Sequence, residues 1–331
     1  MKIILNAFLI LFFTTQLFSQ EHLIKFATLA PEGSTWIKFM REYDKIIRTE
    51  TGGKVGFKIY YGGVAGDEKD VLRKIKLGQY HSAGITGVGL GEIASQIRIL
   101  DSPFLFRNQN EIDFILNKLN KNFRDAFEQN GFILLGWAEV GFVYVYTNKP
   151  IYQISDLTGV KMWAWEGDPV AEATFKALDL SVVPLSITDV RTSLQTKMID
   201  GFYTSPLAAI SLQWFTTVKY LHSYPLANAM GAVVISKKEF DKLPTEFQNI
   251  LLKTGEKIFR NLTLQSRIDN EKSLQVLKTK LKFTEPISKK EIEKYFSIGN
   301  EARIIMSEKL YTKEFMLSIE NALSEYRQQK K

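Results

Sequence analysis

The most constraining feature of this sequence is an alternation of strand-like and helix-like segments that occurs twice. In the first series, the apolar stretches Leu23–Thr28, Val55–Tyr61 and Ser82–Thr86 are separated by segments with helical periodicity. The alternation begins again after residue 130, with further strands at Val160–Trp165 and Ile199–Thr204. Such alternation builds helix-covered, mainly parallel sheets, so the 331 residues predict two α/β domains with a cleft between them.

The order of the segments also predicts how the two domains are connected. Residues 20–138 and part of 227–331 are expected to form lobe I, and residues 139–226 lobe II. A long helix at 245–280 is expected to pack across both lobes, followed by a helical C-terminus. The chain crosses between the lobes near Glu139–Gly141 and Leu226–Met230, which are therefore our candidate hinges.

The N-terminus has the pattern of an export signal. Lys2 precedes the apolar run Ile3–Phe13, and the small residue Ser19 marks the expected cleavage point. The run is too short to span a bilayer, although an uncleaved N-terminal anchor is the alternative. Residues 1–19 are thus predicted to be a signal peptide. The mature protein would be periplasmic and not membrane-spanning, which disfavours chemistry based on cytosolic ATP or NAD.

Composition excludes several classes of site. The sequence has no cysteine and three widely separated histidines, so a disulfide, a thiolate metal site or a histidine-rich metal site is not expected. The net charge of +7 is spread over the chain, which argues against a nucleic-acid face. Glycines 84, 87, 89 and 91 lack the spacing of a nucleotide-binding loop and indicate a turn near a ligand. No cofactor is therefore predicted.

An enzyme is disfavoured for a similar reason. No serine, histidine and acid combination has a recognisable catalytic spacing. Glu166 and Asp168 could form an acid–base pair, but Asp168 precedes Pro169 and is better explained as a helix N-cap. We therefore expect a binding protein.

Ligands of open α/β sheets bind beyond the carboxyl ends of the strands. Aromatic residues gather at these ends, and Trp163 and Trp165 face the same side of one strand. Core packing is the competing explanation for each tryptophan alone. The predicted ligand-binding residues are Ser34, Gly87, Phe142, Trp163, Trp165, Glu166, Tyr203, Ser205 and Trp214.

Five segments together resemble one known protein family. They are Asp156–Met162, with the pattern DL-x-G-x-K-M; Gly66–Gly78, which begins Gly-Asp-Glu; Leu194–Gly201, which ends Asp-Gly; Pro206–Leu207; and Phe240–Gln248, which contains Leu-Pro-Thr-Glu. In order and spacing they are similar to motifs in the solute-binding subunits of tripartite ATP-independent periplasmic (TRAP) transporters, of the dicarboxylate-binding type. The resemblance covers about residues 23–310.

The resemblance implies a two-lobed, periplasmic-binding-protein-like fold that closes on a small organic solute. It also implies delivery of that solute to the membrane subunits of a sodium-coupled TRAP permease. In most members of the family, the first motif ends in a lysine and an apolar residue, and an arginine follows them; this chain has Trp163 at that position. Many members carry a second arginine in the strand that here contains Val143. These arginines grip a carboxylate, so their absence predicts a solute with an apolar body.

Some alternatives remain open from the sequence. Lys161 could hold a single carboxylate, whereas Arg191 is expected to be a solvated helix residue. A dicarboxylate or monocarboxylate could be bound by another clamp. A lipid-binding or sensory module and an exported lyase are the competing functions on the same fold.

Overall fold

The computed structural model describes residues 21–330, so the predicted signal peptide lies outside the described residues. Lobe I, as we define it here, is built on a five-stranded sheet in the order β2-β1-β3-β11-β4. Strands β1 and β2 are parallel, as are β1 and β3, whereas β11 runs antiparallel to both of its neighbours. The strands are β1 (His22–Thr28), β2 (Val55–Tyr60), β3 (Ser82–Thr86), β4 (Phe132–Trp137) and β11 (Gly231–Ser236).

Three helices of lobe I begin at side-chain caps that the sequence supplies. Ser34 accepts a hydrogen bond from the Ile37 amide and starts α1, while Asp67 accepts from the Glu68 amide and starts α2. Asn108 caps α4 in the same way. The helices of lobe I are α1 (Thr35–Glu50), α2 (Glu68–Lys76), α3 (Gly87–Ile93), the 3₁₀ helix η1 (Ser95–Asp101), α4 (Gln109–Gln129) and α8 (Lys237–Phe240).

Lobe II is built on a second sheet, of seven strands. Its order is β12-β9-β5-β8-β6-β7, and β10 pairs with β5. The strands are β5 (Gly141–Thr147), β6 (Met162–Trp165), β7 (Val182–Leu185), β8 (Gly201–Thr204), β9 (Tyr220–His222), β10 (Ala227–Ala229) and β12 (Lys282–Thr284). Its helices are η2 (Ile154–Leu157), α5 (Pro169–Ala177), η3 (Ile187–Asp189), α6 (Val190–Gln195), α7 (Pro206–Ser211) and η4 (Trp214–Thr217).

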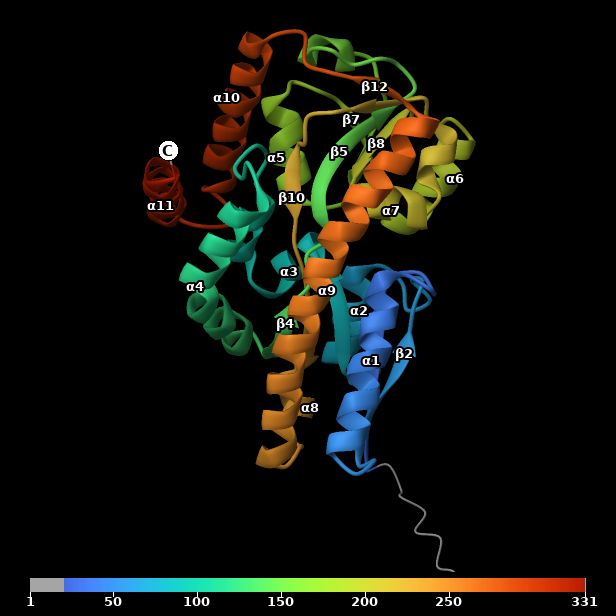
Figure 1. Ribbon diagram of the computed structural model, residues 1–331, viewed down its shortest axis with the longest axis vertical. Helices are drawn as coiled ribbons and strands as arrows, with labels where there is room; N and C mark the ends of the chain where they lie inside the picture. The colour runs from blue at the N-terminus through green and yellow to red at the C-terminus, as the bar shows by residue number, and fades with distance from the viewer. Residues whose placement is uncertain (1–20, 331) are drawn as a thin grey trace, which may run out of the picture.

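Within residues 21–330, three segments join the two sheets. The chain crosses from β4 to β5 through residues 138–140 and returns from β10 to β11 through Met230. Helix α9 (Thr245–Lys280) is the third connection, and Figure 1 shows it running past both sheets. It packs on α1 and β4 of lobe I and on α7 and β5 of lobe II. The observed fold therefore confirms a two-lobed α/β protein with a long helix along both lobes.

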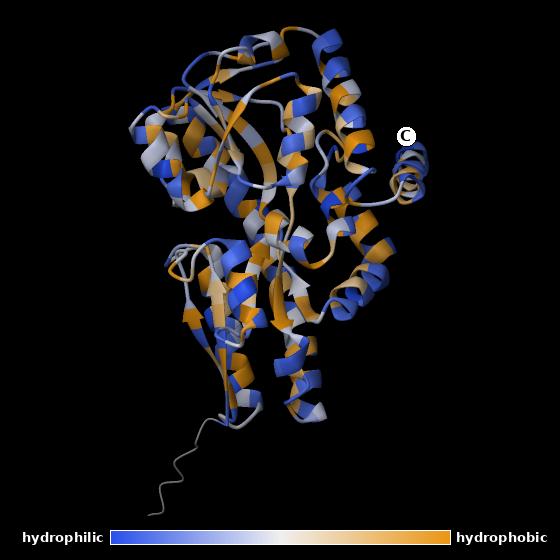
Figure 2. Ribbon diagram, turned by 180° about the vertical axis from the view of Figure 1, so that it is seen from behind, coloured by the Kyte–Doolittle hydropathy of each residue, from blue (hydrophilic) through white to orange (hydrophobic). Residues whose placement is uncertain are grey.

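The C-terminal helices also contact both lobes. Helix α10 (Lys289–Met306) packs on α5 of lobe II, and α11 (Lys313–Gln329) packs on α4 of lobe I. Figure 2 shows hydrophobic residues concentrated on the strands and on the helix faces that cover them. None of the helices within residues 21–330 is both long and apolar enough to cross a membrane.

The prediction of a turn at the glycine-rich segment after β3 was wrong. The segment forms helix α3, whose small residues pack closely: a Cβ at Gly89 would lie 2.9 Å from Ile85 Cβ. Residues 227–236 form two strands that belong to different sheets. Helix α7 ends at Ser211, shortly before Gln213 adopts a left-handed conformation (φ 59°).

Candidate functional site

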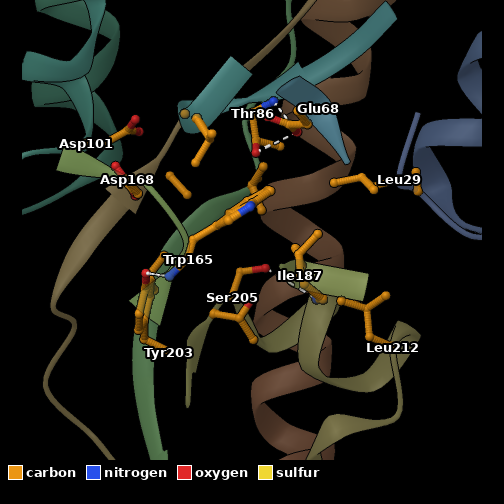
Figure 3. Close-up of a pocket in the computed structure, with 18 of the residues that line it drawn as sticks. Leu29, Glu68, Thr86, Asp101, Trp165, Asp168, Ile187, Tyr203, Ser205 and Leu212 are labelled. Atoms are coloured by element: carbon orange, nitrogen blue, oxygen red, sulfur yellow. Dashed lines mark hydrogen bonds between the residues drawn. The ribbon is translucent and has the colours of Figure 1, made fainter. Parts of the chain in front are cut away.

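A cleft of about 550 Å³ lies between the two lobes. It is bounded by the carboxyl ends of β1 and β3 in lobe I and of β6 and β8 in lobe II. In Figure 3, Trp165 lies near its centre, Asp101 and Asp168 lie on one side, and Leu29 and Leu212 lie on the other. The position is that expected for a ligand of open α/β sheets.

The lobe II wall of the cleft is aromatic. Trp163 stacks on Tyr203 with ring centroids 5.0 Å apart and meets the edge of Trp214 at 5.4 Å. The Trp163 indole donates to the Leu185 carbonyl oxygen at 3.0 Å, which fixes the ring within lobe II. Trp163 is only 2% exposed, so it forms the base of the wall more than its surface.

Trp165 extends from the same strand toward lobe I. Its Nε1 donates to Asp67 Oδ2 at 3.1 Å, and Ser186 Oγ of lobe II donates to the same oxygen at 2.6 Å. Lys69 Nζ, from the second residue of α2, donates to the Gly167 carbonyl oxygen at 3.0 Å. These contacts join the lobes above the cleft, so the structure represents a closed arrangement.

A buried ion-pair cluster lies at the end of the cleft beside α5. Arg98 of η1 contacts Asp101 at 3.0 Å and, across the lobes, Asp168 at 2.9 Å; all three side chains are less than 10% exposed. Burial raises the pKa of Asp101 to about 6, although Arg98 and the Met230 amide lower it. Asp101 and Asp168 already balance the charge of Arg98, although its Nη1 donates no hydrogen bond within the described residues.

Glu68 is a second buried carboxyl group in the lining. It accepts hydrogen bonds from the Thr86 amide, the Thr86 hydroxyl and the Gly89 amide at 2.8–2.9 Å. Burial raises its pKa to about 7, even though these hydrogen bonds lower it. Hydrogen bonds from lobe I therefore hold the Glu68 carboxylate in place, and this group can accept a proton near neutral pH.

Arg191 is the other arginine of the lining, and it lies exposed on α6. Within residues 21–330, no carboxylate lies within ion-pair distance of its guanidinium. Arg191 is a solvated helix residue, as expected, but helix α6 follows η3 directly and also brings residue 191 to the edge of the cleft. Lys161, by contrast, is exposed and outside the lining.

The structure brings together seven of the nine residues predicted for the site. They line the cleft and are Ser34, Gly87, Trp163, Trp165, Tyr203, Ser205 and Trp214. Two lie elsewhere. Glu166 is exposed beyond the end of β6, and Phe142 packs against the core of lobe I because it faces away from Val143, its neighbour in the lining.

The predicted cap at Asp168 is present and argues against acid–base chemistry there. Asp168 Oδ1 accepts from the Val170 amide at 3.0 Å at the start of α5, while it pairs with Arg98. Glu166 is exposed outside the cleft, so the two carboxylates do not form a facing pair within it.

Sequence reasoning missed Glu68, Arg98 and Asp101. Arg98 and Asp101 belong to a 3₁₀ helix that no periodicity predicts, and they meet Asp168 only through the packing of the lobes. Glu68 carried a usable signal, because it follows the N-cap Asp67 within the Gly-Asp-Glu segment at the edge of the predicted cleft.

Curated relatives agree with this architecture. A solute-binding protein of Verminephrobacter eiseniae is 28% identical over 63% of this chain and 63% of its own length. The 2,3-diketo-L-gulonate-binding periplasmic protein YiaO of Escherichia coli is 24% identical over 65% of this chain and 66% of its own length. The chain thus aligns with slightly less than two thirds of each of these relatives.

Solved structures share the fold. A TRAP periplasmic solute-binding protein of Pseudomonas putida F1 with bound D-glucuronate has a TM-score of 0.82 at 22% identity, covering 90% of this chain and 96% of that chain. One from Desulfovibrio salexigens with bound orotic acid has a TM-score of 0.84 at 17% identity, covering 92% and 99%. The family model of bacterial extracellular solute-binding proteins, family 7 (DctP), matches residues 26–302. The resemblance to TRAP solute-binding subunits is therefore confirmed, and the chain belongs to the bacterial extracellular solute-binding protein family 7.

Proposed function

We propose that this protein captures a small organic solute in the cleft between its lobes and presents it to a TRAP membrane permease. The observation that supports this most directly is the cleft of about 550 Å³ at the carboxyl ends of both sheets. Family membership supports the same conclusion, and no catalytic step is required of the residues in the lining. We expect the mature protein to act in the periplasm and the permease to be sodium-coupled.

The solute is, in this proposal, an apolar body with one carboxylate. Val143 and Trp163 occupy the positions where the family resemblance leads us to expect clamp arginines, and Arg98 is paired with two aspartates. Arg191 also lines the cleft, and within residues 21–330 its guanidinium has no carboxylate partner. The related structures from Pseudomonas putida and Desulfovibrio salexigens hold carboxylic acids, D-glucuronate and orotic acid. A carboxylate at Arg191 would direct the apolar part of the solute toward Trp165.

This orientation follows from desolvation. An unpaired carboxylate placed deep in the cleft, near Glu68, Asp101 and Asp168, would be desolvated among like charges, which costs several kcal/mol. At the exposed Arg191 a carboxylate keeps part of its hydration and gains a charge-assisted hydrogen bond. Trp165 and Tyr203 provide aromatic surface for the remainder, with about 0.5–1.5 kcal/mol per ring pair beyond area burial.

Mass spectrometry of solute that copurifies with the protein tests the proposal most directly. A monocarboxylic acid with an apolar or aromatic body is the expected ligand. Calorimetry should then show that succinate, malate and sialic acid bind no more tightly than millimolar. Submicromolar binding of succinate that a Trp165→Ala variant retains would contradict the proposed solute class.

The role of the permease needs a separate experiment. Uptake of the identified solute into proteoliposomes that contain TRAP membrane subunits from the same organism should require the protein and a sodium gradient. Tight solute binding without any such uptake would favour the sensory alternative on the same fold.

A further inference from the structure

A second cavity, which shares no lining residue with the cleft, lies where the C-terminal helices meet residues 103–107. Its volume is about 290 Å³, and it lies between the segment that follows η1 and helices α10 and α11. Three arginines, Arg107, Arg303 and Arg327, line it together with Phe104, Leu105, Phe296, Asn300 and one carboxylate residue, Glu320. We call these eight residues the arginine crevice. Nothing in the solute-binding function described above uses it.

Two of the arginines form a fixed, partly buried floor. Arg303 Nε donates to Glu320 at 2.7 Å and its Nη1 donates to the Pro103 carbonyl oxygen at 3.0 Å. Arg327 donates to both oxygens of Glu111 at 2.7–2.8 Å and to the Leu105 carbonyl oxygen. Nη2 of Arg303 and Nη1 of Arg327 donate no hydrogen bond within residues 21–330, so donors remain available.

The third arginine supplies an unbalanced charge. The guanidinium of Arg107 lies over the Phe296 ring, 5.4 Å from its centroid, and has no carboxylate within ion-pair distance in the described chain. The Asn300 side chain is exposed and likewise has no hydrogen bond there. The nearby carboxylates Glu111 and Glu320 balance two of the three guanidiniums, so the crevice has a net positive charge.

Phe104 gives the crevice an apolar wall in an unusual backbone conformation. Its φ of 54° is in the left-handed region, which is uncommon for a bulky residue. Its amide donates to the Leu226 carbonyl oxygen at 2.8 Å, and its ring stacks on Tyr295 at 5.2 Å. Such strain persists where surrounding contacts hold it, and it is concentrated at functional sites.

From this combination we propose that the arginine crevice is a second binding site, specific for a carboxylate carried on a flat apolar body. The guanidinium fork matches the two oxygens of a carboxylate, and guanidinium and phenyl groups both pack on flat ligands. A volume of about 290 Å³ is more than a carboxylate group alone would fill, which favours a free small acid over an inorganic anion.

The test uses 4-fluorobenzoate as the probe and the whole mature protein. Amide NMR spectra should show saturable shifts at residues 104–107 and 296–303, and the fluorine signal should broaden. Fluorobenzene, which lacks the carboxylate, should leave these amides unchanged. Because loss of one exposed charge-assisted contact costs about 1.4 kcal/mol, the Arg107→Gln variant should raise the Kd read at these amides about tenfold.

Two matched variants make the outcome decisive. Arg73→Gln removes an exposed arginine on α2 and should leave the Kd unchanged, and Arg191→Gln should affect only shifts in the main cleft. The Arg107 side chain makes no hydrogen bond within residues 21–330, so its replacement should not alter the melting temperature. Shifts confined to the cleft, equal binding of fluorobenzene, or an unchanged Kd in Arg107→Gln would each overturn the proposal.

Discussion

The two walls of the cleft are built from different chemistry. The lobe I wall carries ionisable groups, Glu68, Arg98 and Asp101, each held by other groups of the protein. The lobe II wall carries the rings of Trp163, Trp165 and Tyr203, and its exposed charge is Arg191. The charged wall is therefore committed to the protein's own structure, whereas the aromatic wall and Arg191 are free to contact a solute.

This difference separates stability from specificity. Changes in the charged wall should lower the free energy of unfolding, because they leave buried groups without partners. Changes at the exposed parts of the aromatic wall should alter solute affinity with little effect on folding. The four predictions below test this separation, from the largest expected effect to the smallest.

The strongest test of the charged wall is Arg98→Met. The change leaves Asp101 and Asp168 buried without their cation, and breaking a buried pair in this way costs about 3–5 kcal/mol. Urea denaturation should report this loss in the free energy of unfolding. The matched control is Arg41→Met, which removes a solvent-exposed pair with Glu32 and should cost far less than Arg98→Met. Equal losses in both variants would show that the cluster is not structurally important.

The pH dependence of stability sharpens the same point through Glu68. Its pKa rises from 4.5 to about 7 on folding, so the protonated group favours the folded state. This contribution, ~3 kcal/mol in all, is fully present below pH 4.5 and is lost as the pH rises through about 7. The measurement is the difference in unfolding free energy between wild type and Glu68→Gln across this window. A difference that does not change with pH would contradict the raised pKa.

The sequence predicted the aromatic wall better than the charged one. Trp163 and Trp165 could be placed on one face because a strand has a period of two, and Asp168 could be identified as a cap because Pro169 follows it. The ion-pair cluster joins η1 with α5, which are far apart in the chain, and no local pattern encodes that contact.

The misplaced residues have equally physical explanations. Phe142 was expected in the cleft, but its side of the strand faces the core of lobe I. Arg191 was expected on a solvated face, and it is exposed, yet the short connection through η3 turns that face toward the cleft. Strand periodicity thus determines which residues share a face, whereas tertiary packing determines which face meets the ligand.

On the aromatic side, Arg191→Gln should have the largest effect on binding. If its guanidinium holds the solute carboxylate, its loss should raise the Kd about tenfold, or ~1.4 kcal/mol, in calorimetry with the copurified acid. The melting temperature should not change, since Arg191 makes no ion pair within residues 21–330. Lys161→Gln is the matched control, because Lys161 lies outside the lining and should leave the Kd unaltered. If Lys161→Gln raised the Kd and Arg191→Gln left it unchanged, the proposed orientation of the solute would be wrong.

The smallest predicted effect distinguishes two tryptophans of the same strand. Trp165→Phe keeps a ring in the cleft but removes the indole donor to Asp67 across the lobes, whereas the Trp163 indole donates within lobe II. Loss of one such hydrogen bond weakens the closed state by about 1 kcal/mol, so Trp165→Phe should raise the Kd about fivefold. Trp163→Phe should instead lower the unfolding free energy, because it trims a side chain that is 2% exposed. Small-angle scattering with saturating solute should show full closure in Trp163→Phe and more open molecules in Trp165→Phe. Identical closure and affinity in the two variants would mean that the contact between Trp165 and Asp67 does not hold the lobes together.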